Sequence, residues 1–193
     1  PKVCAGKYLL ALEGHQNGHT LRSYQFAPID AKRAANDMVW MKKAIAFFEE
    51  NLGTFPFKEY DCFDGKDYYG IESYSYTILA PGITTWAVSH EMGHTYFGGV
   101  VPCGYVKDSW NEGMTQYVDD VLLHQNPEVE QLAFSGMNIP VPLTEIPVAW
   151  EYGGATYWRG AYAMEMLDAE IGHDKVLAGL RALIKDRVGK DTT

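Results

Sequence analysis

Apolar positions in the first third of the chain predict one long packing helix. Between Asp30 and Gly53 they recur every three or four residues, the spacing of one face of an α-helix. The series comprises Ala34, Met38, Met41, Ile45, Phe48 and Leu52. Asp30 is a favourable N-cap residue and Gly53 a frequent helix terminator, so both ends of this helix are marked.

Segments with β-branched and aromatic residues predict strands on either side of this helix. Residues 7–13 and 19–27 are expected to be two strands, because residues 14–18 between them have turn chemistry. Residues 68–79 are rich in tyrosine and predict a further strand, which Pro81-Gly82 closes.

The remainder of the chain has the periodicity of helices. We expect helices over about 84–97, 109–124, 155–171 and 174–188, and a shorter one that begins at Asn126-Pro127. Residues 135–150 contain three prolines and are expected to form an irregular loop. Because strands come first and helices follow, the predicted fold class is α+β.

Composition limits the kind of protein this can be. The 193 residues suffice for one domain with a core, which we place at 1–193. A net charge of −9 without a Lys/Arg cluster argues against nucleic acid and anionic membranes as partners. No apolar run is long enough to span a bilayer, and there is no signal-peptide layout. A chain that begins at Pro1 is expected to be a processed form or an excised domain, so the compartment stays undetermined.

Neither the cysteines nor four of the six histidines have the spacing along the sequence that is typical of metal ligands. Three cysteines are expected to be buried free thiols, with a Cys62–Cys103 disulfide as the less favoured alternative. Four histidines are predicted to lie at the surface or at helix caps, namely His15, His19, His124 and His173.

The stretch from His90 to His94 carries the strongest chemistry. It has the form H-E-x-x-H, and two histidines four residues apart share one helix face, close enough to hold one metal ion. Glu91 is then placed to take a proton from a water on that metal. The motif is short and also occurs by chance on ordinary helices. Apolar neighbours favour the metal, because buried imidazoles without partners would be costly.

Glu112, within Trp110-Asn111-Glu112-Gly113, offers a third ligand. Two histidines and one glutamate leave a zinc position open for water, which is the layout of a catalytic site. Ser109 and Glu112 also fit a capping box, the competing structural interpretation. We favour the ligand role, because the motif helix otherwise lacks a third ligand. Asn111 either orients a histidine or simply begins its helix.

These blocks resemble those of the M1 family of zinc aminopeptidases, which are gluzincins. The segment from His90 to Gly98 is similar to the family's H-E-x-x-H-x-x-F-G block, and Trp110 to Gly113 is similar to its L-N-E-G block. The resemblance implies a thermolysin-like catalytic domain with one Zn²⁺ per chain. Family members usually carry a β-rich domain before this one and a helical domain after it. The resemblance therefore implies an isolated catalytic domain that either is excised from a longer parent chain with such flanking domains or lacks them.

By the same resemblance each site residue receives a role. His90, His94 and Glu112 would hold the zinc, and Glu91 would be the general base. Gly70-Ile71-Glu72 stands where the family has G-x-M-E-N, so these residues would bind substrate, with Glu72 on its free amino group.

The resemblance implies that a fourth block would supply the oxyanion donor, Tyr157. Tyr157-Trp158-Arg159-Gly160 is similar to the family's Y-x-K-G, whose tyrosine donates a hydrogen bond to the tetrahedral oxyanion. Such a donor is chemically sensible, because it stabilises charge that develops only in the transition state.

The chain also departs from the family pattern. Tyr69 and Ser73 replace the first glycine and the asparagine of G-x-M-E-N, and Arg159 replaces a lysine. The gap between His94 and Glu112 is also about one residue shorter than the family spacing.

The resulting hypothesis is a zinc-dependent peptidase that releases N-terminal residues from a peptide substrate. Two alternatives remain open. One is a zinc endopeptidase or other zinc hydrolase with the same site, since the altered surroundings of Glu72 weaken the exopeptidase assignment. The other is a binding or scaffold domain that keeps zinc but has little activity.

Overall fold

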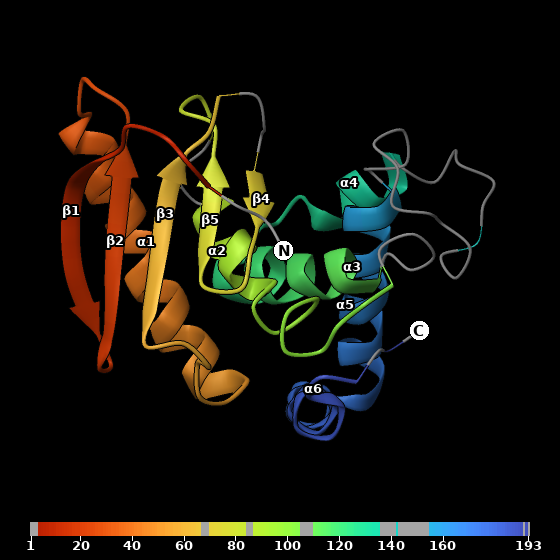
Figure 1. Cartoon of the computed structure of the whole chain (residues 1–193). Helices are drawn as coiled ribbons and strands as arrows, with labels where there is room; N and C mark the ends of the chain where they lie inside the picture. Colours follow the sequence, from red (N-terminus) through yellow and green to blue (C-terminus); the bar gives the residue numbers. More distant parts are fainter. Residues whose placement is uncertain are drawn as a thin grey trace. The chain divides into compact units, whose positions relative to one another are not determined.

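The computed structural model describes residues 4–66, 70–83, 87–104, 110–135, 142, 155–190 and 192. The chain divides into two compact units, residues 1–95 and 96–193. In the first unit a sheet is covered by helices, and the described part of the second unit is mostly helical (Figure 1). The α+β class predicted from the sequence is confirmed.

The sheet of the first unit has five strands in the order β1-β2-β3-β5-β4. Their bounds are β1 Leu9–Gln16, β2 His19–Gln25, β3 Glu59–Asp64, β4 Gly70–Glu72 and β5 Tyr76–Leu79. The central strands β2, β3 and β5 are parallel, whereas β1 and β4 pair antiparallel with their neighbours. The sheet is therefore mixed, with an antiparallel strand at each edge (Figure 1).

The predicted hairpin at the N-terminus is confirmed, with a longer first strand, a shorter second strand and a tighter turn. Strand β1 continues to Gln16, and only Asn17 and Gly18 form the turn, with φ of 50° and 81°. Both values lie in the left-handed region that favours asparagine and glycine, as in the two-residue turns that match the twist of a hairpin.

Helix α1, Ala31–Asn51, matches the predicted packing helix. The Asp30 side chain accepts a hydrogen bond from the Arg33 amide at 2.9 Å, so Asp30 is the N-cap. The apolar stripe from Ala34 to Leu52 is buried, and Gly53 leaves the helix with φ of 110°. The helix packs against β1 and β2 and against the helix that carries the H-E-x-x-H motif (Figure 1).

The single strand predicted over 68–79 is wrong. Within its described part the chain forms two antiparallel strands, β4 and β5, separated by a turn at residues 73–75. The Thr77 hydroxyl donates a hydrogen bond to the Ile71 carbonyl at 3.0 Å, which holds the two strands together. Strand β3 was not predicted.

The second unit contains six helical segments within its described residues. They are α3 Trp110–Gln116, the π-helix η1 Tyr117–Leu123, α4 Val129–Ser135, the π-helix η5 Ala155–Arg159, α5 Gly160–Ile171 and α6 His173–Arg187. The helices predicted over 109–124, 155–171 and 174–188 correspond to α3 with η1, η5 with α5, and α6. Most of the loop predicted over 135–150 lies outside the described residues.

The prediction for His19 is wrong, because this histidine is buried in the first unit rather than at the surface. Its Nδ1 lies 2.6 Å from the Phe57 carbonyl oxygen, and its Nε2 lies 3.0 Å from a carboxylate oxygen of Glu49. These two polar partners compensate for its removal from water.

Two further sequence expectations concern the cysteines and the membrane. Cys4, Cys62 and Cys103 are free thiols, and the latter two are buried. Among the described helices, none has the length and apolar character needed to cross a membrane.

Candidate metal centre

The H-E-x-x-H motif lies on α2, Ala87–Gly93, in the first unit. The helix was predicted to run to Phe97, but it ends at Gly93, because the Thr95 amide bonds to the Met92 carbonyl at 3.0 Å and tightens the chain. The His94 amide still bonds to the His90 carbonyl at 3.3 Å. His94 therefore keeps its position one helical turn from His90. The predicted start of the helix, at residues 84–85, lies outside the described residues.

The two histidine rings converge on one point. Their Nε2 atoms are 3.2 Å apart, with ring centroids separated by 4.9 Å and ring planes at 81°. His94 is only 3% exposed, and His90 is half-buried. Two imidazole nitrogens directed at the same point are the arrangement that a shared metal ion requires.

The carboxylate of Glu91 lies beside Gly70 of β4. A methyl carbon placed on Gly70 would lie 2.5 Å from the Glu91 Oε1 and 3.3 Å from its Cδ. Glu91 is 8% exposed, so its carboxylate is held against the β4 backbone with little access to bulk water. Gly70, predicted as a substrate-binding residue, thus lies next to the candidate general base.

Glu72 and Ile71 follow on the same short strand. Both side chains are half-buried, and they pair with Thr77 and Ile78 of β5. Strand β4 contacts α2, so the segment predicted to bind substrate and the motif helix pack together within the first unit.

Sequence reasoning missed Tyr60, a completely buried tyrosine of β3. Burial raises the pKa of its phenol well above the usual range, and the charges of Glu91 and Glu72 raise it further. The sequence offered only a weak hint, because Tyr60 alternates with Cys62 and Asp64 in a strand that was not recognised.

Glu112 and Asn111 lie on α3 of the second unit, and both are buried. Glu112 is 7% exposed. Within the described part of the chain, neither amide atom of Asn111 has a hydrogen-bond partner. The capping-box alternative depends on Ser109, which lies outside the described residues.

Tyr157 lies on η5 in the second unit and is half-buried. Helix α3 contacts both η5 and α5, and the backbones of Gly113 and Gly160 approach each other closely there. The block that carries Glu112 and the block that carries Tyr157 are therefore packed against each other.

Among the described residues, one group of side chains could hold a metal ion. Each of His90, His94 and Glu112 offers one ligand atom, and these atoms lie within 4.8 Å of one another. Two imidazole nitrogens and one carboxylate oxygen, all in buried or half-buried side chains, form a donor set that suits zinc.

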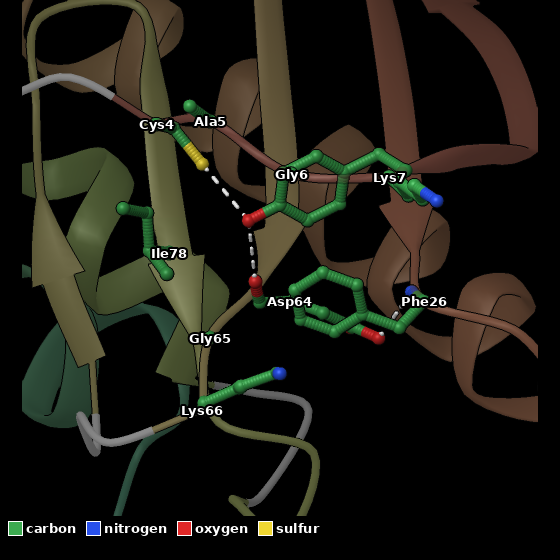
Figure 2. A pocket seen from close by; sticks show the side chains of 10 residues that line it. Cys4, Ala5, Gly6, Lys7, Phe26, Asp64, Gly65, Lys66 and Ile78 are labelled. Carbon is green, nitrogen blue, oxygen red and sulfur yellow. Dashed lines mark hydrogen bonds between the residues drawn. The ribbon is translucent and has the colours of Figure 1, made fainter.

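A cavity of about 490 Å³ lies elsewhere in the first unit (Figure 2). At its wall the Cys4 thiol lies 3.1 Å from the Tyr8 hydroxyl, which donates to the Asp64 carbonyl at 3.0 Å. The other lining residues are Ala5, Gly6, Lys7, Phe26, Gly65, Lys66 and Ile78. None of the predicted site residues lines this cavity, so it is separate from the candidate metal centre.

Comparisons with known proteins identify the fold. The M1 zinc metallopeptidase from Deinococcus radiodurans is similar with a TM-score of 0.78 and 17% sequence identity, over 97% of this chain and 46% of that chain. A mutant of that enzyme bound to a Tyr-Ser-Ala substrate gives the same TM-score, identity and coverage. So does a mutant of a two-domain M1 zinc metallopeptidase bound to L-tryptophan.

These matches confirm the fold that the motif resemblance implied. At 16–17% identity the likeness concerns the fold alone. The chain spans about half the length of these M1 peptidases, at 46% of each. A scan against models of protein families and a search of curated proteins gave no match.

Proposed function

We propose that residues 1–193 form a divergent catalytic domain of the M1 type, a zinc-dependent peptidase that releases N-terminal residues from peptides. The observation that carries the proposal is the convergence of His90 and His94, with Glu112 completing the donor set, in a chain with the M1 peptidase fold. An accidental H-E-x-x-H on an ordinary helix would not be expected together with this fold.

Each candidate residue would have its own role in the reaction. A zinc ion held by His90, His94 and Glu112 would polarise the scissile carbonyl and lower the pKa of a bound water. Glu91 takes the proton from the attacking water and passes it to the leaving amine. The burial of Glu91 supports this role, since it strengthens the electrostatic interactions of its carboxylate.

Three further residues would orient the substrate and the ligands. Tyr157 donates a hydrogen bond to the oxyanion that develops in the transition state. Glu72 binds the free amino group of the substrate, and this contact would make the enzyme an aminopeptidase. Asn111 orients a metal-binding histidine, and its buried amide, which has no hydrogen-bond partner within the described residues, supports such a role.

The decisive experiment compares zinc-loaded wild-type protein with Glu91→Gln on matched peptides. One peptide has a free amino terminus and the other is N-acetylated. Wild type should cleave the free peptide and leave the acetylated one largely intact. Glu91→Gln should retain one zinc per chain but lose turnover, while Glu50→Gln, an exposed acid of α1, should leave activity unchanged.

Each alternative has its own outcome in this experiment. Equal cleavage of both peptides would favour an endopeptidase. One bound zinc without hydrolysis of a broad peptide library would favour a binding or scaffold domain. Near-normal activity of Glu91→Gln would contradict the proposed mechanism.

A further inference from the structure

The cavity of the first unit lies where parallel strands of the sheet end (Figure 2). Among its lining residues, Phe26 directly follows β2, Gly65 and Lys66 follow β3, and Ile78 lies near the end of β5. In open sheets with parallel strands, ligands bind in the crevice beyond the carboxyl ends of the strands. A volume of about 490 Å³ is within the range of cavities that hold a small organic ligand. Position and size together make this cavity a candidate ligand site.

The segment that precedes β1 forms one wall of the cavity and is held against the sheet. The Tyr8 hydroxyl donates a hydrogen bond to the Asp64 carbonyl at 3.0 Å, and the Cys4 thiol lies 3.1 Å from the same hydroxyl. The Tyr8 ring stacks on Phe26, with centroids 4.7 Å apart and ring planes at 21°. A methyl carbon on Gly6 would lie 2.9 Å from the Tyr8 ring, so the backbone of the segment lies close to that ring. The wall therefore has a defined shape.

The charged groups of the cavity favour an anion. Lys7 and Lys66 are the basic residues among the described lining residues, and both are exposed to solvent. Asp64 is the acid among them, and both of its carboxylate oxygens are engaged. One lies 2.6 Å from an Arg33 side-chain nitrogen, and the other accepts a hydrogen bond from the Phe26 amide at 3.0 Å. Because Arg33 neutralises Asp64, a ligand meets the positive charge of two lysines, in a chain with a net charge of −9.

The apolar groups of the cavity favour a flat ligand body. Phe26 is half-buried, and the Lys66 ammonium lies 5.5 Å from the centroid of its ring. Cation–π attraction acts at this separation and holds the ammonium beside the ring. Ile78 adds an aliphatic surface from β5. An aromatic ring placed against Phe26 and Ile78 would therefore bring an acidic substituent next to Lys66.

We propose that this cavity binds a small aromatic carboxylate, whose ring packs against Phe26 and Ile78 and whose carboxylate accepts hydrogen bonds from Lys66. The inference goes beyond the proposed peptidase function, since none of the predicted site residues lines the cavity. A charge-assisted hydrogen bond gives the acid its advantage over a neutral compound of the same shape. The apolar walls give an aromatic acid an advantage over an inorganic anion such as phosphate.

The test compares 2-naphthoate with 2-naphthamide, a neutral compound of nearly the same shape, by calorimetric titration of the zinc-loaded protein. Wild type should bind the acid about tenfold more tightly than the amide, as expected for one hydrogen bond between charged groups. Lys66→Met keeps an apolar stem but removes the ammonium, so this preference should disappear. The matched control is Lys43→Met on α1. The Lys43 ammonium also lies over an aromatic ring, 4.2 Å from the Trp40 centroid, but outside the cavity, so the preference should remain.

The Cys4 thiol at the cavity wall reports where the ligand binds. Cys4 is half-buried, whereas Cys62 and Cys103 are buried, so iodoacetamide should alkylate Cys4 first. At ten times its Kd, 2-naphthoate should slow this alkylation about tenfold, as measured by mass spectrometry, because few cavities are then empty.

Three results would each overturn the inference. The first is equal affinity of wild type for the acid and the amide, or no binding of either. The second is an unchanged preference for the acid in Lys66→Met. The third is binding of 2-naphthoate that leaves the alkylation of Cys4 as fast as in the free protein, because the ligand would then lie elsewhere. Peptidase activity enters none of these measurements, so failure of the proposed function would leave them interpretable.

Discussion

Gly113 of α3 and Gly160 of α5 lie in backbone contact. A methyl carbon on Gly113 would lie 2.7 Å from the Gly160 Cα, and one on Gly160 would lie 2.6 Å from the Gly113 Cα. Each glycine is the last residue of a candidate functional block, since Gly113 follows Glu112 and Gly160 lies three residues after Tyr157. The absence of both side chains lets the two helices approach closely enough to place these blocks side by side.

Gly160→Ala should therefore destabilise the protein and weaken metal binding. The obstructing atoms belong to a backbone, which cannot rotate away, so an overpacking cost of about 2 kcal/mol is expected. This cost exceeds the gain of about 1 kcal/mol that alanine brings to a helix. Urea unfolding and zinc titration measure the two effects.

Gly179→Ala on α6 is the matched control for this substitution. No atom lies within 4 Å of a methyl carbon at Gly179, so only the helix-propensity gain remains and the variant should be more stable than wild type. A Gly160→Ala protein as stable as Gly179→Ala would contradict the importance of the close contact.

Gly70→Ala should impair catalysis more than folding. The new methyl group would meet the end of the Glu91 side chain, which can move, so the stability loss is small. The carboxylate is displaced in the process, and a misplacement of about 1 Å lowers rates by roughly 100-fold. Steady-state kinetics should show a lower kcat with unchanged zinc content. Gly82→Ala, with no atom within 4 Å of its methyl group, should behave as wild type.

Zinc should stabilise the native protein through His90 and His94. A ligand that binds only the native state adds about 2.7 kcal/mol at a free concentration one hundred times its Kd. Thermal unfolding with and without zinc should therefore show a higher Tm for the loaded protein. His94→Ala should abolish this increase, while His15→Ala, at the end of β1, should retain it. An equal Tm increase in His94→Ala would place the zinc elsewhere.

Tyr157→Phe should lower kcat with little effect on KM. A hydrogen bond donated to a developing oxyanion acts in the transition state, and loss of one such donor typically costs about 100-fold in kcat. Tyr74→Phe is the control, since Tyr74 is exposed on the surface of the first unit. A Tyr157→Phe variant with raised KM and unchanged kcat would indicate a substrate-binding residue instead.

The sequence predicted α1 well because its information is local. The apolar stripe, the Asp30 cap and Gly53 all lie within the helix or at its ends. The same is true of the His90–His94 pair, whose convergence follows from helical spacing alone. A structural feature whose residues and contacts all lie within one segment of the chain can therefore be predicted from the sequence of that segment.

Strand β3 and the β4–β5 hairpin depend on distant partners, and they were missed or misassigned. The buried positions of β3 include Asp64, so its strand pattern does not alternate between apolar and polar residues. Asp64 tolerates burial because an Arg33 side-chain nitrogen from α1 lies 2.6 Å away. The contact of Gly70 with Glu91 and the burial of Tyr60 likewise arise only when the sheet and α2 pack together, so no local pattern indicates them.

The buried acid Asp37 predicts a pH dependence of stability in the first unit. It is 3% exposed on α1, and burial raises its pKa from 3.8 to about 6, although Arg33 opposes the shift. The folded state therefore holds the proton more tightly than the unfolded chain does. Its contribution to the free energy of unfolding is fully present below pH 3.8 and is lost as the pH rises through about 6. The loss is on the order of 3 kcal/mol.

Asp37→Asn keeps the shape and hydrogen-bonding capacity of the side chain but cannot ionise. Relative to wild type, the variant should gain stability progressively between about pH 4 and pH 6 and then hold a constant advantage at higher pH. Urea unfolding at several pH values in this range measures the difference. Glu50→Gln, an exposed acid on the same helix, should show no such trend. A difference between Asp37→Asn and wild type that does not vary with pH would mean that Asp37 is already ionised throughout this range, despite its burial.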